Sequence, residues 1–327
     1  MESNAQSTVT VHALSAGRLT LPERFFVTPA SATATRTAPS LAFLVQHTTS
    51  ATPQKTTRLL FDLGLRRNPN TYPVPIRKHI STRQPMNTFP DVVASLAQGG
   101  LTPNDIDYVI LSHVHWDHVG TPTDFTNPDT RFIVGHGSLD LLDGTNKISI
   151  GSHSHFERNL LPLERTLELS DVDDISSDKS DEGSESTTSS VDDFRVPPWQ
   201  PLGDILPHTI DLFGDGSVHI VHAPGHLPGH INLLARVSPD KSVYLAGDAC
   251  HDTRLFLGTH QIATWEDDVG RVCCIHVDKV KAEETIGRIK RLAQHGSGEG
   301  EVEVVFAHNT EWAEKAREDG RFWPGML

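Results

Sequence analysis

Four side chains that can bind metal ions lie within six residues of one stretch, Ile110-Leu-Ser-His-Val-His-Trp-Asp-His-Val-Gly120. They are His113, His115, Asp117 and His118. The apolar run over residues 107–111 predicts a buried β-strand, so the four residues fall on the loop at its carboxyl end. Binding and catalytic residues concentrate on loops that a rigid sheet holds in place, so the sequence predicts a site here.

The spacing of these residues predicts two metal positions. Alternate side chains of an extended segment point the same way, so His113 and His115 can close on one ion. Asp117 and His118 then turn toward a neighbouring position. The alternative is a surface loop that contains histidines by chance. Because four ligand-type residues in register rarely arise by accident, we favour the metal site.

The bulk properties of the chain are those of a globular enzyme. Its 327 residues, of which 37% are hydrophobic, suffice for a substantial core. No apolar run reaches the length of about 18 residues that a membrane-spanning helix needs. The polar amino terminus lacks the features of a signal peptide, so we expect a flexible segment over residues 1–7 and a cytoplasmic protein. The three cysteines lack CxxC spacing, which leaves His and Asp as the expected ligands.

Much of the acidic charge is concentrated in one segment. The formal net charge is −14, which disfavours binding to the phosphate backbone of nucleic acids. Residues 168–193 contain ten acidic residues, one lysine and eight serines. Such a segment has too little apolar surface to offset the entropy lost on ordering. It predicts a disordered insertion in a single domain over residues 8–327; a tract of regulatory phosphorylation sites is the alternative.

Apolar patterns predict the elements around the motif. Residues 8–48 alternate apolar and polar residues between Pro, Ser and Thr, as the edge strands of a sandwich do. Residues 66–87 are rich in Pro, Arg and turn residues and predict a long loop that forms a wall of the substrate pocket. Further strands are expected at 58–64, 131–135, 205–210, 218–222, 231–237, 242–247 and 301–307, and helices at 90–98, 138–143, 278–294 and 310–318.

The run His113-Val-His115-Trp-Asp117-His118 also resembles the HxHxDH motif of the metallo-β-lactamase fold. That family needs three further ligands downstream, and all three are present in order. They are His226 in Ala-Pro-Gly-His-Leu-Pro-Gly-His, Asp248 after Tyr-Leu-Ala-Gly, and His308 after Val-Val-Phe-Ala. The resemblance covers about residues 9–311 and implies an α/β fold, an αββα sandwich of two mixed β-sheets flanked by helices.

Other residues near these motifs have secondary or open roles. The tight Pro- and Gly-rich turn and the resemblance both favour His226 as the ligand, so His230 should pack or hydrogen-bond beneath it. Asp62 resembles the acid of the family's FDTG-type turn and either supports the ligand loop or is a simple turn acid. His153 and His155 repeat the HxH spacing without an acid and a third histidine nearby, so we interpret them as loop residues.

The ligand types and the resemblance together predict a dinuclear zinc site. Imidazole and carboxylate groups suit zinc, and the two oxygens of Asp248 can bridge two ions. Two zinc ions lower the pKa of water, so a metal-held hydroxide near neutral pH predicts hydrolysis, with Asp117 and Asp248 as catalytic residues. The expected ligands are His113, His115 and His226 at one ion, Asp117, His118 and His308 at the other, and Asp248 at both.

Within that family, the layout of the chain is most similar to the acyl-homoserine lactonase branch. Zinc β-lactamases commonly have Arg at the position of His118 and Cys at that of Asp248. Glyoxalase II-type thioesterases carry a helical extension, whereas 19 residues follow His308 here. The lactonases usually have a tyrosine where this chain has His251. That histidine is a third expected catalytic residue, as a hydrogen-bond donor or proton carrier; a structural histidine is the alternative.

The sequence therefore predicts an enzyme that opens a small cyclic ester or amide, with a lactone preferred to a lactam. The alternatives are a thioesterase of the same fold, a mononuclear iron dioxygenase that uses His113, His226 and Asp248, and a metal-binding module without catalysis. The expected partner is a small-molecule substrate, without nucleic acid or membrane. The sequence makes no prediction of the oligomeric state.

Overall fold

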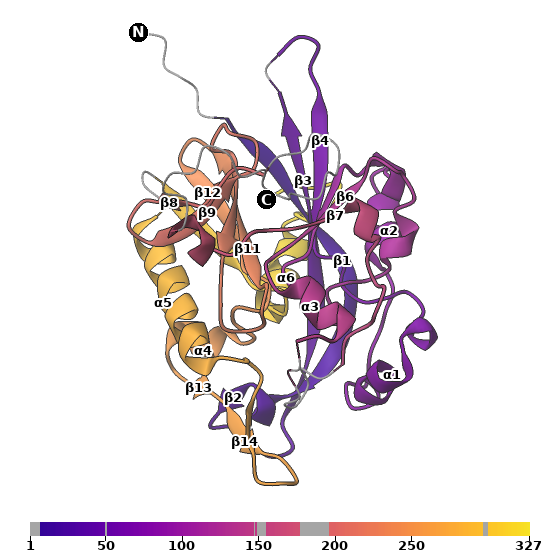
Figure 1. The fold of residues 1–327 in the computed structure, drawn as a ribbon, viewed down its shortest axis with the longest axis vertical. Helices are drawn as coiled ribbons and strands as arrows, with labels where there is room; N and C mark the ends of the chain where they lie inside the picture. Colours follow the sequence, from indigo (N-terminus) through magenta and orange to yellow (C-terminus); the bar gives the residue numbers. More distant parts are fainter. Residues whose placement is uncertain (1–6, 50, 147, 149–154, 177–195, 297–299) are drawn as a thin grey trace.

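The computed structural model describes residues 7–49, 51–146, 148, 155–176, 196–296 and 300–327. Within these residues two six-stranded sheets lie against each other, and helices cover their outer faces (Figure 1). The first sheet has the strand order β1-β3-β4-β5-β6-β7, and the second has the order β16-β12-β11-β10-β9-β8. This arrangement confirms the predicted α/β sandwich.

The first sheet combines antiparallel and parallel strands. Its antiparallel part is formed by β1 (Val9–Pro22), β3 (Thr35–Thr48) and β4 (Thr56–Phe61). Its parallel part continues from β4 to β5 (Tyr108–Ile110), β6 (Arg131–Val134) and β7 (Thr166–Glu168). Because β4 and β5 are parallel, the segments that follow Phe61 and Ile110 leave the sheet at the same edge.

The second sheet is antiparallel except for one pair. Its antiparallel strands are β8 (Gln200–Leu202), β9 (Leu206–Asp211), β10 (Val218–His222), β11 (Ile231–Ser238) and β12 (Lys241–Leu245). The last strand, β16 (Glu301–Val305), pairs in parallel with β12. The segments that follow Leu245 and Val305 therefore also leave the sheet at one edge.

Two short antiparallel strand pairs and a short helix lie apart from the two main sheets. β2 (Val27–Thr28) pairs with β13 (Gln261–Ile262), and β14 (Thr264–Glu266) pairs with β15 (Val272–Cys274). The helix α4 (Thr253–Leu257) begins five residues after Asp248 and precedes β13. These pieces lie together at one end of the molecule, at the bottom of Figure 1.

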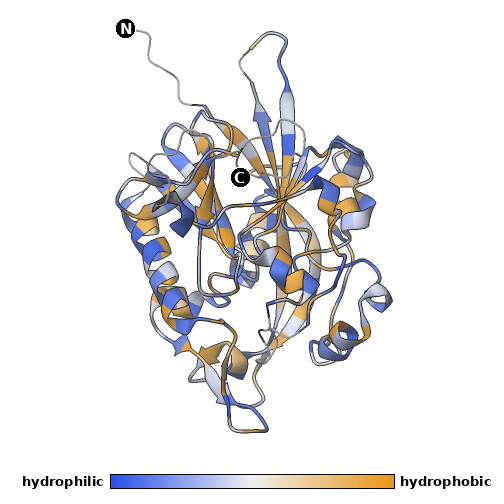
Figure 2. Ribbon diagram, viewed as in Figure 1, coloured by the Kyte–Doolittle hydropathy of each residue, from blue (hydrophilic) through white to orange (hydrophobic). Residues whose placement is uncertain are grey.

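Alternation along the strands builds an inner and two outer apolar layers. In β3, Leu41, Phe43 and Val45 join the layer between the sheets, whereas Ala42 and Leu44 join an outer layer. That outer layer includes buried residues of α2 (Val92–Ala97) and α3 (Ser138–Asp143). The outer face of the second sheet is covered by α5 (Lys279–His295). In Figure 2 the strands are mostly hydrophobic, and α5 carries both hydrophilic and hydrophobic residues.

Several elements have the bounds that the sequence predicted. The ranges of α3, β10 and α6 (Thr310–Glu318) are those expected, and α5 begins and ends one residue later than expected. The side chains of Asp278 and Asn309 cap α5 and α6, because each accepts a 3.0 Å hydrogen bond from a backbone N–H of the first turn. These helices were predictable because a cap and an apolar stripe coincide.

Two expectations differ from the structure. The predicted loop over residues 66–87 contains a helix, α1 (Val74–Ile80). The predicted disordered insertion over residues 168–193 starts too early, because Glu168 ends β7 and Leu169 is buried in the inner layer. A short 3₁₀ helix then follows at Asp173–Ser176, while residues 177–193 lie outside the described part of the chain. Of the predicted flexible segment over residues 1–7, only residue 7 is described.

The remaining composition-based expectations concern cysteines and membrane spans. All three cysteines are free thiols, as their number and spacing predicted. Among the described residues, the helices are all too short or too polar to cross a membrane.

Candidate metal centre

The ligand loop that leaves β5 is fixed by backbone hydrogen bonds from both sheets. Leu63 N, after β4, donates to His118 O at 2.7 Å. Ile231 N, at the start of β11, donates to Ser112 O at 2.8 Å. The four predicted ligands of this loop are all buried: His113, His115, Asp117 and His118. The loop therefore presents its side chains inward, between the ends of the two sheets.

The three downstream residues reach this loop because each follows a strand of the second sheet. His226 follows β10, Asp248 follows β12 and His308 follows β16. The parallel pairing of β12 with β16 brings Asp248 and His308 to one edge. Gly247 allows the close approach to the ligand loop: its φ is +46°, and a Cβ there would lie 2.8 Å from the Cβ of Ser112.

Three histidines and one carboxylate oxygen form a first cluster of potential ligands. His115 Nδ1 lies 2.9 Å from His113 Nε2 and 3.0 Å from His226 Nε2. Asp248 Oδ2 lies 3.8 Å from His113 Nε2 and 3.6 Å from His226 Nε2. One ligand atom from each of the four residues lies within 4.8 Å of all the others. Three imidazole nitrogens and one carboxylate oxygen are a donor set that suits tetrahedral zinc.

A second cluster lies on the other side of Asp248. It consists of Asp117, His118 and His308, whose ligand atoms also lie within 4.8 Å of one another. His308 Nε2 lies 3.6 Å from Asp117 Oδ2. Asp248 Oδ1 lies 3.2 Å from His308 Nε2 and 3.3 Å from His118 Nε2. Among the described residues, the buried Nε2 of His118 and Oδ1 of Asp248 find no hydrogen-bond partner of good geometry, as expected where a cation belongs between them.

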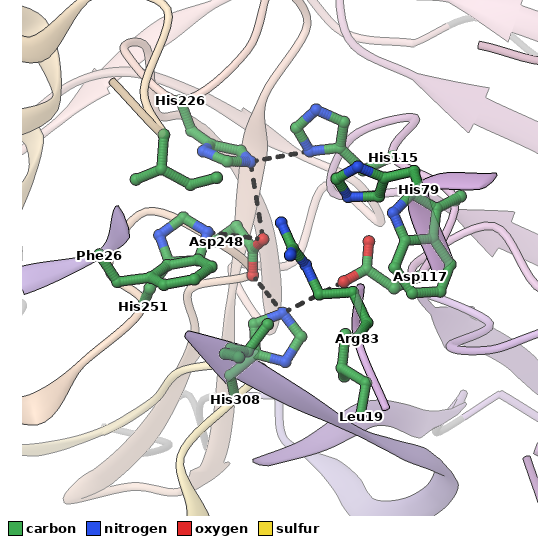
Figure 3. A pocket seen from close by; sticks show the side chains of 13 residues that line it. Leu19, Phe26, His79, Arg83, His115, Asp117, His226, Asp248, His251 and His308 are labelled. Carbon is green, nitrogen blue, oxygen red and sulfur yellow. Dashed lines mark hydrogen bonds and ion pairs between the residues drawn. The ribbon is translucent and has the colours of Figure 1, made fainter. Parts of the chain in front are cut away.

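The carboxylate of Asp248 thus faces both clusters, one oxygen to each. Figure 3 shows it between His226 and His308, with dashed interactions to both. All seven residues that the sequence proposed as metal ligands come together here, although they lie on four separate segments of the chain.

Asp62 holds the ligand loop from behind. Its Oδ2 lies 2.8 Å from His118 Nδ1, and its carboxylate accepts hydrogen bonds from Ser112 N at 2.6 Å and Ser112 Oγ at 2.7 Å. With the Nδ1–H of His118 bound to Asp62, the lone pair of Nε2 is directed to the second cluster. Of the two roles that the sequence left open for Asp62, the structure favours support of the loop.

Two further contacts fix ligand orientation. His308 Nδ1 donates to Pro39 O at 2.7 Å, which directs its Nε2 toward Asp248. His230 lies beneath the site, as expected: its Nδ1 donates to Ala223 O at 3.0 Å, and its Nε2 accepts from the backbone N–H of Asp248 at 3.2 Å. Burial lowers the pKa of His230 to about 3, so the neutral acceptor form prevails.

Burial and charge give the two clusters different proton affinities. Burial, reinforced by neighbouring histidines, lowers the pKa of His113 and His226 well below the ordinary value, so both offer neutral imidazoles. Burial also disfavours the charged forms of His118 and His308, but Asp248 raises the pKa of both above the ordinary value. Burial would raise the pKa of Asp248, yet these histidines hold it well below its usual range. The second cluster therefore attracts positive charge, which a divalent cation can supply.

His251 lies beside the bridging position. Its Nε2 is 3.0 Å from Asp248 Oδ2, and its side chain is buried. Its ring lies parallel to that of His308, with centroids 6.1 Å apart. The structure therefore places this predicted catalytic residue at the site, in contact with the carboxylate that faces both clusters.

The sequence did not single out His276, which is buried at the same site. His226, His251 and His276 form a third group of ligand-type atoms within 4.8 Å of one another. His276 reaches the site because Val277 N donates to His226 O at 3.0 Å, which ties the segment before α5 to the ligand turn. No repeated HxH spacing marks this histidine in the sequence, so its place in the site depends on contacts between distant segments.

The other histidine pair of the sequence lies elsewhere. His155 is 6.1 Å from His79, ring centroid to ring centroid, and belongs to none of the three groups found among the described residues. His153 lies outside the described residues.

A narrow pocket with a volume of about 30 Å³ lies over the clusters. The side chains of His79 and Arg83 line it, and both belong to the segment 66–87 that was predicted to form a pocket wall. Figure 3 shows Arg83 extending among the labelled ligands. The apolar part of the wall comes from Leu19, Leu21, Phe26, Trp116 and Ile275.

Comparisons with known proteins agree with this fold. The family model described as "Metallo-beta-lactamase superfamily" matches residues 71–127, which include the HxHxDH motif. The chain is 28% identical over 255 residues to the cytochrome P450 monooxygenase mpaDE' of Penicillium brevicompactum; the match covers 76% of this chain but 26% of that protein. It is 29% identical over 258 residues to the γ-lactamase FDB1 of Fusarium pseudograminearum, covering 76% of this chain and 54% of the relative.

Solved structures give the same answer for the fold. The structure of a variant of AiiA from B. thuringiensis with N-decanoyl-L-homoserine at its active site superposes with a TM-score of 0.63 and 17% identity, covering 98% of this chain and 100% of that one. The candidate metal clusters lie at the strand ends of this shared fold. The chain therefore has the metallo-β-lactamase fold, and residues 71–127 match the family model of that superfamily.

Proposed function

We propose that the protein is a dinuclear zinc hydrolase that opens a small cyclic ester or amide, with a lactone preferred. The observation that carries this proposal is the position of Asp248, whose two carboxylate oxygens face two separate clusters of ligand atoms. A carboxylate in this position suits two cations better than one. The γ-lactamase among the relatives and the lactonase AiiA among the structural neighbours support the substrate class.

The residues of this chain would divide the work of the site. Two zinc ions, when bound, would supply an activated water and polarise the scissile carbonyl. His113, His115 and His226 would hold one ion, Asp117, His118 and His308 the other, and Asp248 both. Asp62 and the carbonyl of Pro39 keep the imidazoles in their binding orientation. Trp116 and Phe26 make part of the pocket wall apolar, which limits access of bulk water.

In this proposal, His251 positions the bridging carboxylate and faces the reacting group. With its proton on Nε2, it donates a hydrogen bond to Asp248 Oδ2, and its side chain lines the pocket. We expect His251→Phe to lower kcat roughly 10- to 100-fold, because the ring remains but the donor is lost. We expect His251→Gln, whose amide can still donate, to retain more activity than His251→Phe.

The control for this prediction is the metal content. Both His251 variants should keep two ions per chain, measured by elemental analysis, because no ligand of either cluster is replaced. Unchanged turnover in His251→Phe would remove His251 from the mechanism, and equal losses in both variants would show that the donor has no role.

The proposed function as a whole is tested by metal analysis together with a substrate screen. We expect two zinc ions per chain and hydrolysis of lactones or lactams that a chelator abolishes and added zinc restores. One iron per chain with oxygen uptake would instead identify a dioxygenase, and preferred hydrolysis of thioesters would identify a thioesterase. Metal binding without turnover of any of these substrates would identify a non-catalytic module. The single domain and the cytoplasmic location stay predictions.

A further inference from the structure

Two buried arginines near the site differ in how their guanidinium groups are paired. Arg66 and Arg83 are each 7% exposed. The Arg66 side chain donates to Gly120 O at 3.1 Å and Thr71 O at 3.0 Å, and it forms an ion pair with Glu157 at 2.9 Å. Each of its three nitrogens has an acceptor, so Arg66 is an ordinary structural arginine.

The guanidinium of Arg83 has far fewer partners. Among the described residues, its hydrogen bonds come from NH1 alone, to the hydroxyl of Thr82 at 2.9 Å and to the Thr82 carbonyl oxygen at 3.5 Å. Among the described residues, no carboxylate forms an ion pair with Arg83, although the charge of Asp117 acts on it from a distance. Burial lowers the pKa of Arg83, so the group bears a desolvation cost that this chain leaves largely uncompensated.

The position of Arg83 indicates what would complete its pairing. Its side chain lines the pocket together with Asp117, Asp248 and His308, and it extends into the group of labelled ligands in Figure 3. The pocket volume of about 30 Å³ leaves room for little more than water beside the guanidinium. A substrate ring that reaches the clusters must therefore contact the guanidinium or push it aside.

We propose that Arg83 is a specificity-determining residue that binds an anionic oxygen of the substrate, a carboxylate carried beside the scissile ring. A guanidinium offers paired N–H donors that match a carboxylate, and a partly desolvated one binds it more strongly than an exposed one does. The apolar wall formed by Leu19, Phe26 and Ile275 would accept the ring itself. The preferred substrate is then a compact, acid-substituted cyclic ester or amide.

This inference deepens the proposed function and rests on it for the identity of the ring. It does not follow from the metal clusters, because their donor set is the same whether or not the substrate is charged. It also separates the substrate from an uncharged acyl lactone with a long chain, for which an incompletely paired guanidinium in the pocket would be unfavourable.

The first experiment compares two substrates that differ in one charge. The probes are dihydrocoumarin and a dihydrocoumarin that carries a carboxylate on the aromatic ring. We expect the zinc-loaded wild type to prefer the carboxylate form, and Arg83→Met to lower kcat/KM for that form roughly 10- to 100-fold, mainly through KM. For the neutral lactone, the same variant should change kcat/KM less than about three-fold.

Matched variants control for folding and for charge in general. Arg83→Lys keeps the charge without the paired donors and should fall between wild type and Arg83→Met. Arg77→Met removes an exposed arginine of α1 and should behave as wild type. Circular dichroism and melting temperatures identify any variant that does not fold. Equal losses on both lactones, or no loss on either, would overturn the proposal.

A binding measurement separates this inference from the proposed hydrolysis. We expect benzoate to bind the zinc-loaded wild type more tightly than benzamide in a calorimetric titration, and Arg83→Met to remove most of that difference. If neither lactone is hydrolysed but this difference is found and depends on Arg83, the proposed function fails while the anion site stands. If Arg83→Met leaves the difference intact, the anion site fails whatever the enzyme hydrolyses.

Discussion

Replacing Asp248 by alanine is expected to remove both metal ions and nearly all hydrolytic activity. The carboxylate faces both clusters, with Oδ2 3.6 Å from His226 Nε2 and Oδ1 3.2 Å from His308 Nε2. Two ions together supply several kcal/mol of transition-state stabilisation, so turnover should fall by about 10³-fold or more. Elemental analysis of the purified variant and its kcat on the best lactone measure the two effects.

The controls for Asp248→Ala separate loss of metal from loss of fold. Asp248 also pairs with His118 and His308, so its removal leaves buried imidazoles without a counter-charge. Circular dichroism should show native secondary structure before the metal content is interpreted. Asp129→Asn, at an exposed acid outside the site, should keep two ions and full turnover. A folded Asp248→Ala that retains both ions and full activity would contradict the assignment.

Local patterns were enough to predict the strand ends from which the site is built. Asp248 and His308 each follow a continuous apolar run, and such runs predict buried strands whose exits lie at one sheet edge when the strands are parallel. Neither run shows whether β12 and β16 are parallel or antiparallel, and the resemblance implied only that the residues after them bind metal at one site. The structure supplies the reason, because the register of Leu245 with Val305 places the two ligands together.

The parts of the site that the sequence did not predict depend on contacts between distant segments. His276 stands in no repeated spacing and reaches the site through the bond from Val277 N to His226 O. The pocket wall over residues 66–87 was predicted from composition, but its prolines led to the prediction of a loop where α1 forms. Pro75 lies in the first turn of that helix, where its missing N–H removes no intrahelical hydrogen bond. The incomplete pairing of Arg83 likewise becomes visible only when its neighbours in space are known.

The acidic segment shows the opposite error, because composition predicted disorder at a residue that the structure places in a strand. Glu168 and Leu169 were assigned to a disordered insertion because they border a run of serines and acids. In the structure Glu168 pairs with Val134 in the first sheet, and Leu169 N donates to Val134 O at 2.9 Å. Composition is averaged over a window of residues, so it does not locate the single residue at which a strand ends.

Replacing one ligand of each cluster in turn is expected to divide the metal content. His226→Ala removes one of three imidazoles from the first cluster, and His308→Ala removes one of two imidazoles from the second. Because the shared carboxylate of Asp248 remains, each variant should keep about one ion per chain. Each should also lose at least about 10²-fold in kcat, since the reaction uses both ions. His295→Ala, at an exposed histidine that ends α5, should keep two ions and wild-type turnover.

The His308 variant distinguishes the dinuclear site from its mononuclear rival. A single iron held by His113, His226 and Asp248 would leave His308 outside the coordination shell, so His308→Ala would keep its one metal ion and most of its activity. In a dinuclear site the same change is expected to halve the metal content, because it removes one of the two imidazoles that hold the second ion and so weakens its binding. Metal content that falls in His226→Ala but not in His308→Ala would therefore reject the second ion, even if the enzyme proved to be a hydrolase.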